Sequence, residues 1–123
     1  MIKIDFENHF YDQSLLEEFS KRQQPPFYRK KNNVITWTDA ITMPQDAILP
    51  QLLEVAEKRN QLMKEQGVDL VILSSSPGPE QLDEESSIKI CRKTNYALAE
   101  ITKKGRCTVS FCWIQRKFRT FHA

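Results

Sequence analysis

Acidic residues are missing from one end of this 123-residue sequence. The last 18 residues, 106–123, hold four Lys or Arg and no Asp or Glu, and so carry +4. Residues 1–105 hold the other 14 basic residues against all 16 acids, a net −2. The overall charge of +2 therefore describes neither part, and the sequence divides into a body, residues 1–105, and a basic tail, residues 106–123.

Long apolar runs and a framework of paired cysteines are also missing. No run approaches the roughly 18–20 apolar residues of a membrane helix, so we expect no membrane partner. The start of the chain lacks the apolar core of a secretory signal, which predicts a cytoplasmic protein. We therefore expect the three cysteines, Cys91, Cys107 and Cys112, to be reduced thiols. The length suits one small globular domain.

The first half of the body predicts a strand, a helix and an irregular stretch. Residues 2–6 alternate apolar and polar side chains, which is the period of a strand. Asp12 is expected to cap a short helix that buries Leu15, Leu16 and Phe19. Residues 25–44 contain three prolines and predict a long excursion with about one short strand.

The second half of the body predicts helix, strand, loop and helix. One helix is expected from Asp46 to a stop at Gly67, followed by a strand at 68–73 that is buried on both faces. A second helix is expected to start at Asp83, and a third strand directly after Gly105. The first helix would bury one face (Leu49, Leu52, Leu53, Ala56, Asn60, Met63). The second would use the apolar positions Ile88, Cys91, Tyr96, Leu98 and Ile101.

This order predicts an α/β chain with parallel strands joined by right-handed crossovers. Polar residues that end such strands are the usual active-site positions of α/β barrels. Glu7 and His9 are such residues, and their i, i+2 spacing lets a carboxylate and an imidazole converge on Zn²⁺, Mn²⁺ or Fe²⁺. The same triplet also arises by chance, and two ligands alone do not make a metal site.

Two other segments have both a functional and a structural interpretation. Residues 74–79 could bring hydroxyl and backbone N–H groups to a ligand, or serve only as a strand-to-helix turn. The basic tail mixes aromatic and basic residues as nucleic-acid-binding patches do. Because the tail lacks acids, periodicity and turn signals, we expect a disordered extension and no nucleic-acid partner.

Taken together, the motifs resemble one known family. Residues 4–10 resemble the first barrel strand of the amidohydrolase-related family of aminocarboxymuconate-semialdehyde decarboxylase and the dihydroxybenzoate decarboxylases, in which E-x-H often replaces H-x-H. Residues 59–74, 76–78 and 95–100 are similar to three further segments of that family. The resemblance covers about residues 2–105.

The resemblance implies the N-terminal part, about two βα units, of a (β/α)₈ TIM barrel with one divalent metal, Zn or Mn. It also implies nonoxidative decarboxylation, or hydrolysis, of an aromatic or unsaturated carboxylic acid, and an oligomeric parent protein. Glu7 and His9 match metal ligands, while Phe10, Ser76, Pro77 and Gly78 match the substrate side. The family's catalytic residues lie on later strands, so no catalytic residue is assigned and we expect an inactive fragment with weak or absent metal binding.

The basic tail matches no family motif. Read in another frame with permitted codons, residues 105–118 yield a sequence similar to the family's third strand, so we hypothesise that 106–123 are out of frame. The rival interpretation is a small stand-alone α/β interaction module that uses the tail to bind a partner or nucleic acid.

Overall fold

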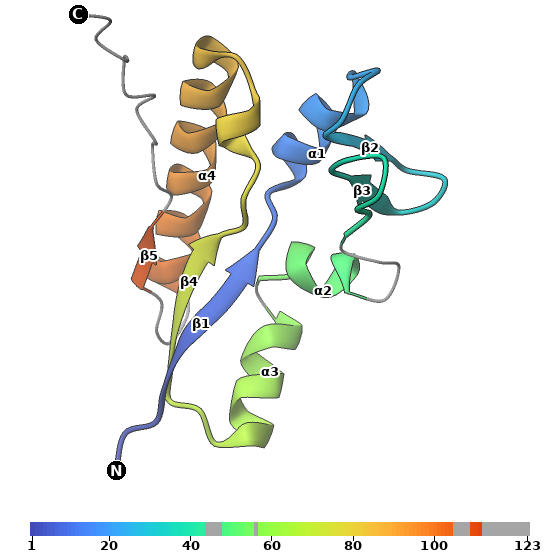
Figure 1. The fold of residues 1–123 in the computed structure, drawn as a ribbon. Coiled ribbons are helices and arrows are strands. Elements are labelled where there is room, and N and C mark those ends of the chain that lie inside the picture. Colours follow the sequence, from blue (N-terminus) through green and yellow to red (C-terminus); the bar gives the residue numbers. More distant parts are fainter. Residues whose placement is uncertain (44–47, 56, 105–108, 112–123) are drawn as a thin grey trace, which may run out of the picture.

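The computed structural model describes residues 1–43, 48–55, 57–104 and 109–111. Five strands, four α-helices and one 3₁₀ turn are described (Figure 1). In chain order they are β1 (Ile4–Phe10), α1 (Gln13–Ser20), β2 (Phe27–Arg29), β3 (Val34–Thr36), α2 (Leu49–Leu53), α3 (Glu57–Gln66), β4 (Leu70–Ser75), η1 (Pro79–Gln81), α4 (Glu84–Lys104) and β5 (Val109–Phe111).

A three-stranded parallel sheet in the order β1-β4-β5 organises the chain. The predicted mixed α/β chain with parallel strands is therefore confirmed. The expected strand after Gly105 is β5, which pairs with β4 from Ile72 to Ser74. Three residues of the basic tail thus join the sheet, and the prediction for the rest of the tail lies outside the described residues.

The two faces of the sheet are covered unequally. Val71 and Leu73 of β4 are buried against Leu98 of α4, with Met63 of α3 packed beside them. On β1, by contrast, Ile4 is 42% exposed and Phe6 is 68% exposed. We call the face opposite Val71 and Leu73 the open face. The strand at 68–73, expected to be buried on both faces, instead alternates in burial along β4.

A second cluster of buried side chains gathers around α1. Asp12 accepts a hydrogen bond from the Ser14 N–H and caps this helix as predicted, and Leu15, Leu16 and Phe19 are buried. Residues 25–44 contain two short strands, β2 and β3, rather than one, and these pair as an antiparallel hairpin. Trp37, which follows β3, meets Phe19 edge to face at 5.9 Å between ring centroids.

The single helix expected over 46–67 was wrong, because two helices, α2 and α3, occupy this segment. The backbone of Glu54 is extended, and its carboxylate accepts the Arg59 N–H at 2.9 Å in the first turn of α3. A side chain therefore satisfies a donor that a continuous helix would have paired internally. Asn60 is exposed rather than on a buried face, Ala56 lies outside the described residues, and Gly67 ends α3 with a φ of 64° as predicted.

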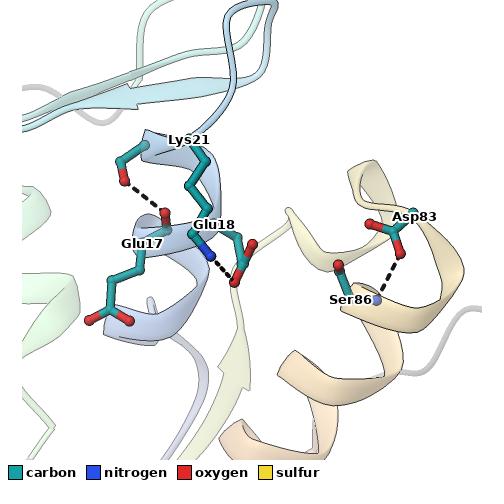
Figure 2. Close-up of polar contacts among 6 residues, drawn as sticks. Glu17, Glu18, Lys21, Asp83 and Ser86 are labelled. Carbon is teal, nitrogen blue, oxygen red and sulfur yellow. Dashed lines mark hydrogen bonds and ion pairs between the residues drawn. The ribbon is translucent and has the colours of Figure 1, made fainter.

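Helix α4 contributes to both clusters, through Ile90 in one and Leu98 in the other. Its predicted cap is confirmed, since Asp83 accepts the Ser86 N–H at 2.9 Å (Figure 2). Tyr96, expected at an apolar position, is 75% exposed. Thr94, 1% exposed, lies on the buried side one turn before Leu98 instead. None of the described helices is both long and apolar enough to cross a membrane.

Candidate site at the carboxyl ends of strands β1 and β4

Strand β1 places Glu7 and His9 near its carboxyl end, next to β4. His9 pairs with Ser74 in the parallel register, and the Ser74 Oγ lies 2.8 Å from the His9 Nδ1. The neighbouring pair Phe10 and Ser75 continues the same register, and the Ser76 N–H donates to the Phe10 carbonyl at 2.9 Å. The backbones on both sides of the His9–Ser74 contact are therefore fixed by the sheet.

A bulge in β1 sets which face His9 occupies. Asp5 pairs with Val71 and Asn8 with Leu73, so that Phe6 and Glu7 together oppose the single residue Ile72. The Asp5 carboxylate stabilises this geometry, because it accepts the Glu7 N–H at 3.2 Å and the Asn8 side-chain amide at 2.7 Å. After the bulge, His9 and Ser74 lie on the open face.

The free edge of β1 forms one wall of an open groove of about 840 Å³. Residues of α2 and α3 form the opposite wall, and Figure 1 shows both helices beside β1. Glu7 and His9 both line the groove and both are exposed, as a binding role requires. Glu7 and His9 therefore both border this groove, which runs along the edge of β1 and also includes Val71 and Met63 of the covered face.

Arg59 of α3 ties the groove wall to the end of β1. Its guanidinium donates to the Glu54 carbonyl at 3.1 Å and to the His9 and Gln51 carbonyls at 3.2 Å each. Burial lowers the pKa of this guanidinium, while the charges of Glu54 and Asp5 oppose that change. Three backbone carbonyls thus accept from its Nε and Nη2 atoms, and one of these bonds ties Arg59 to the backbone of His9.

The predicted substrate-side residues lie away from the groove walls. Phe10 is 3% exposed and packs in the cluster beneath the sheet, and Ser76 is 6% exposed. Gly78 is also buried, and Pro77 alone among these residues is exposed. None of the four lines the groove that contains Glu7 and His9, so their contact with a substrate stays a prediction.

Ser76 has an internal partner in Tyr11, which is 6% exposed. Burial raises the pKa of the Tyr11 phenol to about 12, a hydrogen bond with the Ser76 side chain opposes that rise, and the Glu80 charge adds to it. The Ser76 hydroxyl therefore satisfies a buried phenol inside the fold. This internal hydrogen bond accounts for a serine at position 76, and the explanation needs no bound ligand.

The donor set at the strand ends suits a divalent metal only in part. A carboxylate and an imidazole are ligands of Zn²⁺ and Mn²⁺, and both are accessible here. Among the described residues, however, no third His, Cys, Asp or Glu joins Glu7 and His9. The pair would supply two of the four ligands of a tetrahedral zinc site.

Two residues of this site were not singled out as site residues from the sequence. Ser74 lay within the predicted loop, but the structure includes it in β4 opposite His9. Parallel pairing of residues 4–10 with 70–75 would have brought them together, but the bulge had no sequence signal. Arg59 opens the family-like segment 59–74, yet nothing in its spacing indicated the carbonyls that it holds.

Comparison of the chain with protein-family models, with curated proteins and with solved structures gives no match.

Proposed function

We propose that this chain forms the first strands of a metal-dependent (β/α)₈ barrel of the amidohydrolase-related family, in which Glu7 and His9 are metal ligands. The observation that carries the proposal is the exposed Glu7–His9 pair at the carboxyl end of a parallel strand. That end is where barrel enzymes bind substrate. Helices α3 and α4 packing on the opposite face of the sheet agree with the outer ring of such a barrel.

The parent activity in this proposal is nonoxidative decarboxylation, or hydrolysis, of an aromatic or unsaturated carboxylic acid in the cytoplasm. The divalent metal, when bound, supplies stabilisation of the charge that develops on the substrate. Glu7 and His9 hold it from β1, and Arg59 fixes the backbone of His9. In this proposal the remaining ligands and the catalytic groups belong to further strands of the barrel.

Metal titration tests the proposed ligands. Calorimetry with Zn²⁺ or Mn²⁺ should give no tight one-to-one site, because two protein ligands leave half of a tetrahedral shell to water. At high metal concentration the His9 ring signals in NMR spectra should still shift, and Glu7→Gln, which keeps the ring, should weaken that response.

Glu17→Gln is the matched control, since Glu17 is an exposed acid on α1 (Figure 2) and does not line the groove. Tight stoichiometric binding, or a response of the His9 ring that is unchanged in Glu7→Gln, would contradict the proposal.

The nucleotide sequence downstream of codon 105 tests the family and the origin of the basic tail. The proposal that residues 106–123 are out of frame expects a barrel-like continuation in another frame. It also accounts for four basic residues without an acid after a body of net charge −2. If no frame contains such a continuation, the out-of-frame origin is wrong and the stand-alone module becomes the better interpretation.

A further inference from the structure

We propose that Ser74 is the positioning residue for His9, holding the ring by Nδ1 so that Nε2 is left for the metal. The Ser74 Oγ and the His9 Nδ1 are 2.8 Å apart and come from directly paired positions of β4 and β1. That Nε2 binds a metal rests on the proposed function. The Ser74–His9 contact, and the tautomer that this contact selects, do not depend on it.

The chemistry of the pair selects one form of the imidazole. A neutral imidazole carries one N–H, and a serine hydroxyl accepts as well as donates. When Ser74 accepts from the Nδ1–H of His9, the Nε2 atom holds the lone pair that a metal needs. Metal-binding histidines almost always donate their other ring N–H to a neighbouring oxygen, which fixes the ring orientation.

The surroundings of His9 make this contact the one that orients the ring. His9 is exposed on an edge strand of the described sheet, so its side-chain torsions are less restricted by packing than those of a buried residue. In the part of the chain that the structure describes, the Ser74 contact is the hydrogen bond made by the His9 ring. The backbone beneath it is fixed separately, by the pairing with β4 and by Arg59 on the His9 carbonyl at 3.2 Å.

The opposite assignment of roles gives the proposal a clear competitor. If Ser74 were a nucleophile and His9 its base, the hydroxyl would donate to an unprotonated Nδ1, and the ring would carry its proton on Nε2. The two assignments therefore require different tautomers of the same ring. Measuring the tautomer of His9 distinguishes them without any metal or substrate.

The experiment uses ¹⁵N-labelled full-length chain that carries His122→Gln, so that His9 is the only imidazole. Ring nitrogen shifts are recorded above pH 8.5, where imidazoles are neutral. We expect the Nδ1–H form to dominate, loss of that dominance in Ser74→Ala, and its recovery in Ser74→Thr. Ser75→Ala is the matched control, because the Ser75 hydroxyl donates to the Ser76 carbonyl at 3.1 Å and should leave the tautomer unchanged.

A dominant Nε2–H form in the parent chain would overturn the proposal, as would an unchanged tautomer in a folded Ser74→Ala variant. If Ser74→Ala does not fold, by circular dichroism, the parent spectrum and Ser74→Thr still decide between the two tautomers.

A second arm adds Zn²⁺ alone and follows the same ring signals. Ser74→Ala should weaken the apparent zinc affinity about 10–100-fold, the usual effect of removing the partner of a ligating histidine. If the parent shows the Nδ1–H form but no response to zinc, the proposed metal function fails while the assignment of Ser74 stands. An affinity equal in the parent and in Ser74→Ala would contradict a positioning role toward metal.

Discussion

At the scale of single residues, two turns of the chain require glycine, and each does so for a different reason. Gly78, between β4 and α4, has a φ of 153°, and a Cβ there would lie 2.6 Å from Leu15 Cδ2 and 3.2 Å from Phe19 Cζ. Gly67, after α3, has a φ of 64°, and a Cβ there would meet only the Lys3 Nζ at 3.7 Å. Space and backbone conformation both require glycine at Gly78, whereas at Gly67 the conformation alone does.

Gly78→Ala should therefore destabilise the fold more than Gly67→Ala. We expect about 1–2 kcal/mol for Gly67→Ala, from the left-handed backbone alone. Gly78→Ala should cost roughly 1–3 kcal/mol more, because the added methyl overpacks the core between the loop and α1. Urea unfolding of both variants measures the difference, and equal losses would show that the loop relaxes away from Leu15.

The sequence predicted the role of a single residue well where that role depends only on its near neighbours in the chain. Asp12 and Asp83 cap helices, and Gly67 ends one, because each motif depends on the next few residues only. The exposure of Ile4 and Phe6 could not be predicted in this way. Burial on a strand depends on what covers each face of the sheet, and the described helices pack on the other face.

At the scale of elements, α4 depends on its first turn. The Asp83 carboxylate accepts the Ser86 N–H at 2.9 Å. Figure 2 draws this contact in one view with the Lys21–Glu18 ion pair of α1. The backbone and side-chain hydrogen bonds with Ser86 lower the pKa of Asp83. Helix α4 carries buried residues of both clusters, so fraying at this end affects the packing around α1 first.

Asp83→Ala should lower the urea midpoint of unfolding at pH 7. Because the folded-state pKa lies below the unfolded one, the ionised cap contributes stability above the unfolded value, near 4. That contribution disappears as pH falls through the folded-state pKa. The difference in urea midpoint between the unsubstituted chain and Asp83→Ala should thus shrink on acidification from pH 7 to pH 3.

Asp83→Asn keeps the accepting oxygen and should stay close to the parent at pH 7, without this pH dependence. Glu17→Ala, which removes an exposed carboxylate from α1, is the control and should change neither quantity. A constant difference between parent and Asp83→Ala across the pH range would contradict the role of the ionised cap.

The existence of elements was predicted best where a sequence pattern continued without interruption, as in the apolar run of β4 and the helical spacing of α4. The break between α2 and α3 was missed, because the apolar positions Leu49, Leu52, Leu53 and Met63 keep helical spacing across it. Both helices need apolar residues, because α2 packs with the cluster around α1 and Met63 of α3 packs under the sheet. The apolar spacing therefore continues across the break. The candidate site followed the same division: the strand-end positions of Glu7 and His9 were predicted and their role as metal ligands stays a prediction, while the tertiary contacts of Ser74 and Arg59 were not predicted.

At the scale of the whole molecule, the uncovered half of the sheet is the dominant feature. Strand β1 is an edge strand of the described sheet, and it presents Ile4 and Phe6 to solvent beside Ile2, which is 75% exposed. Edge strands with exposed apolar side chains promote association with other chains. In the proposed barrel, further strands would cover this surface.

Phe6→Thr should reduce concentration-dependent association of the purified chain without changing its circular dichroism, because threonine suits a strand and removes the exposed ring. Sedimentation velocity over a concentration series measures the effect. Ile41→Thr is the matched control, since Ile41 is 49% exposed in a loop outside the sheet. If both variants associate as the parent does, the sheet is not the surface through which chains meet.

The bulge in β1 separates two stretches that each pair regularly with β4, residues 4–5 before it and residues 8–10 after it. From Asp5 to Asn8 the chain moves three residues along β1, whereas the paired positions on β4, Val71 and Leu73, are only two residues apart. Deleting one residue there would restore one-to-one pairing and leave both Asp5 opposite Val71 and His9 opposite Ser74. A difference of one residue in the length of β1 is thereby absorbed at the bulge, without moving Asp5 or the His9 imidazole from its partner on β4.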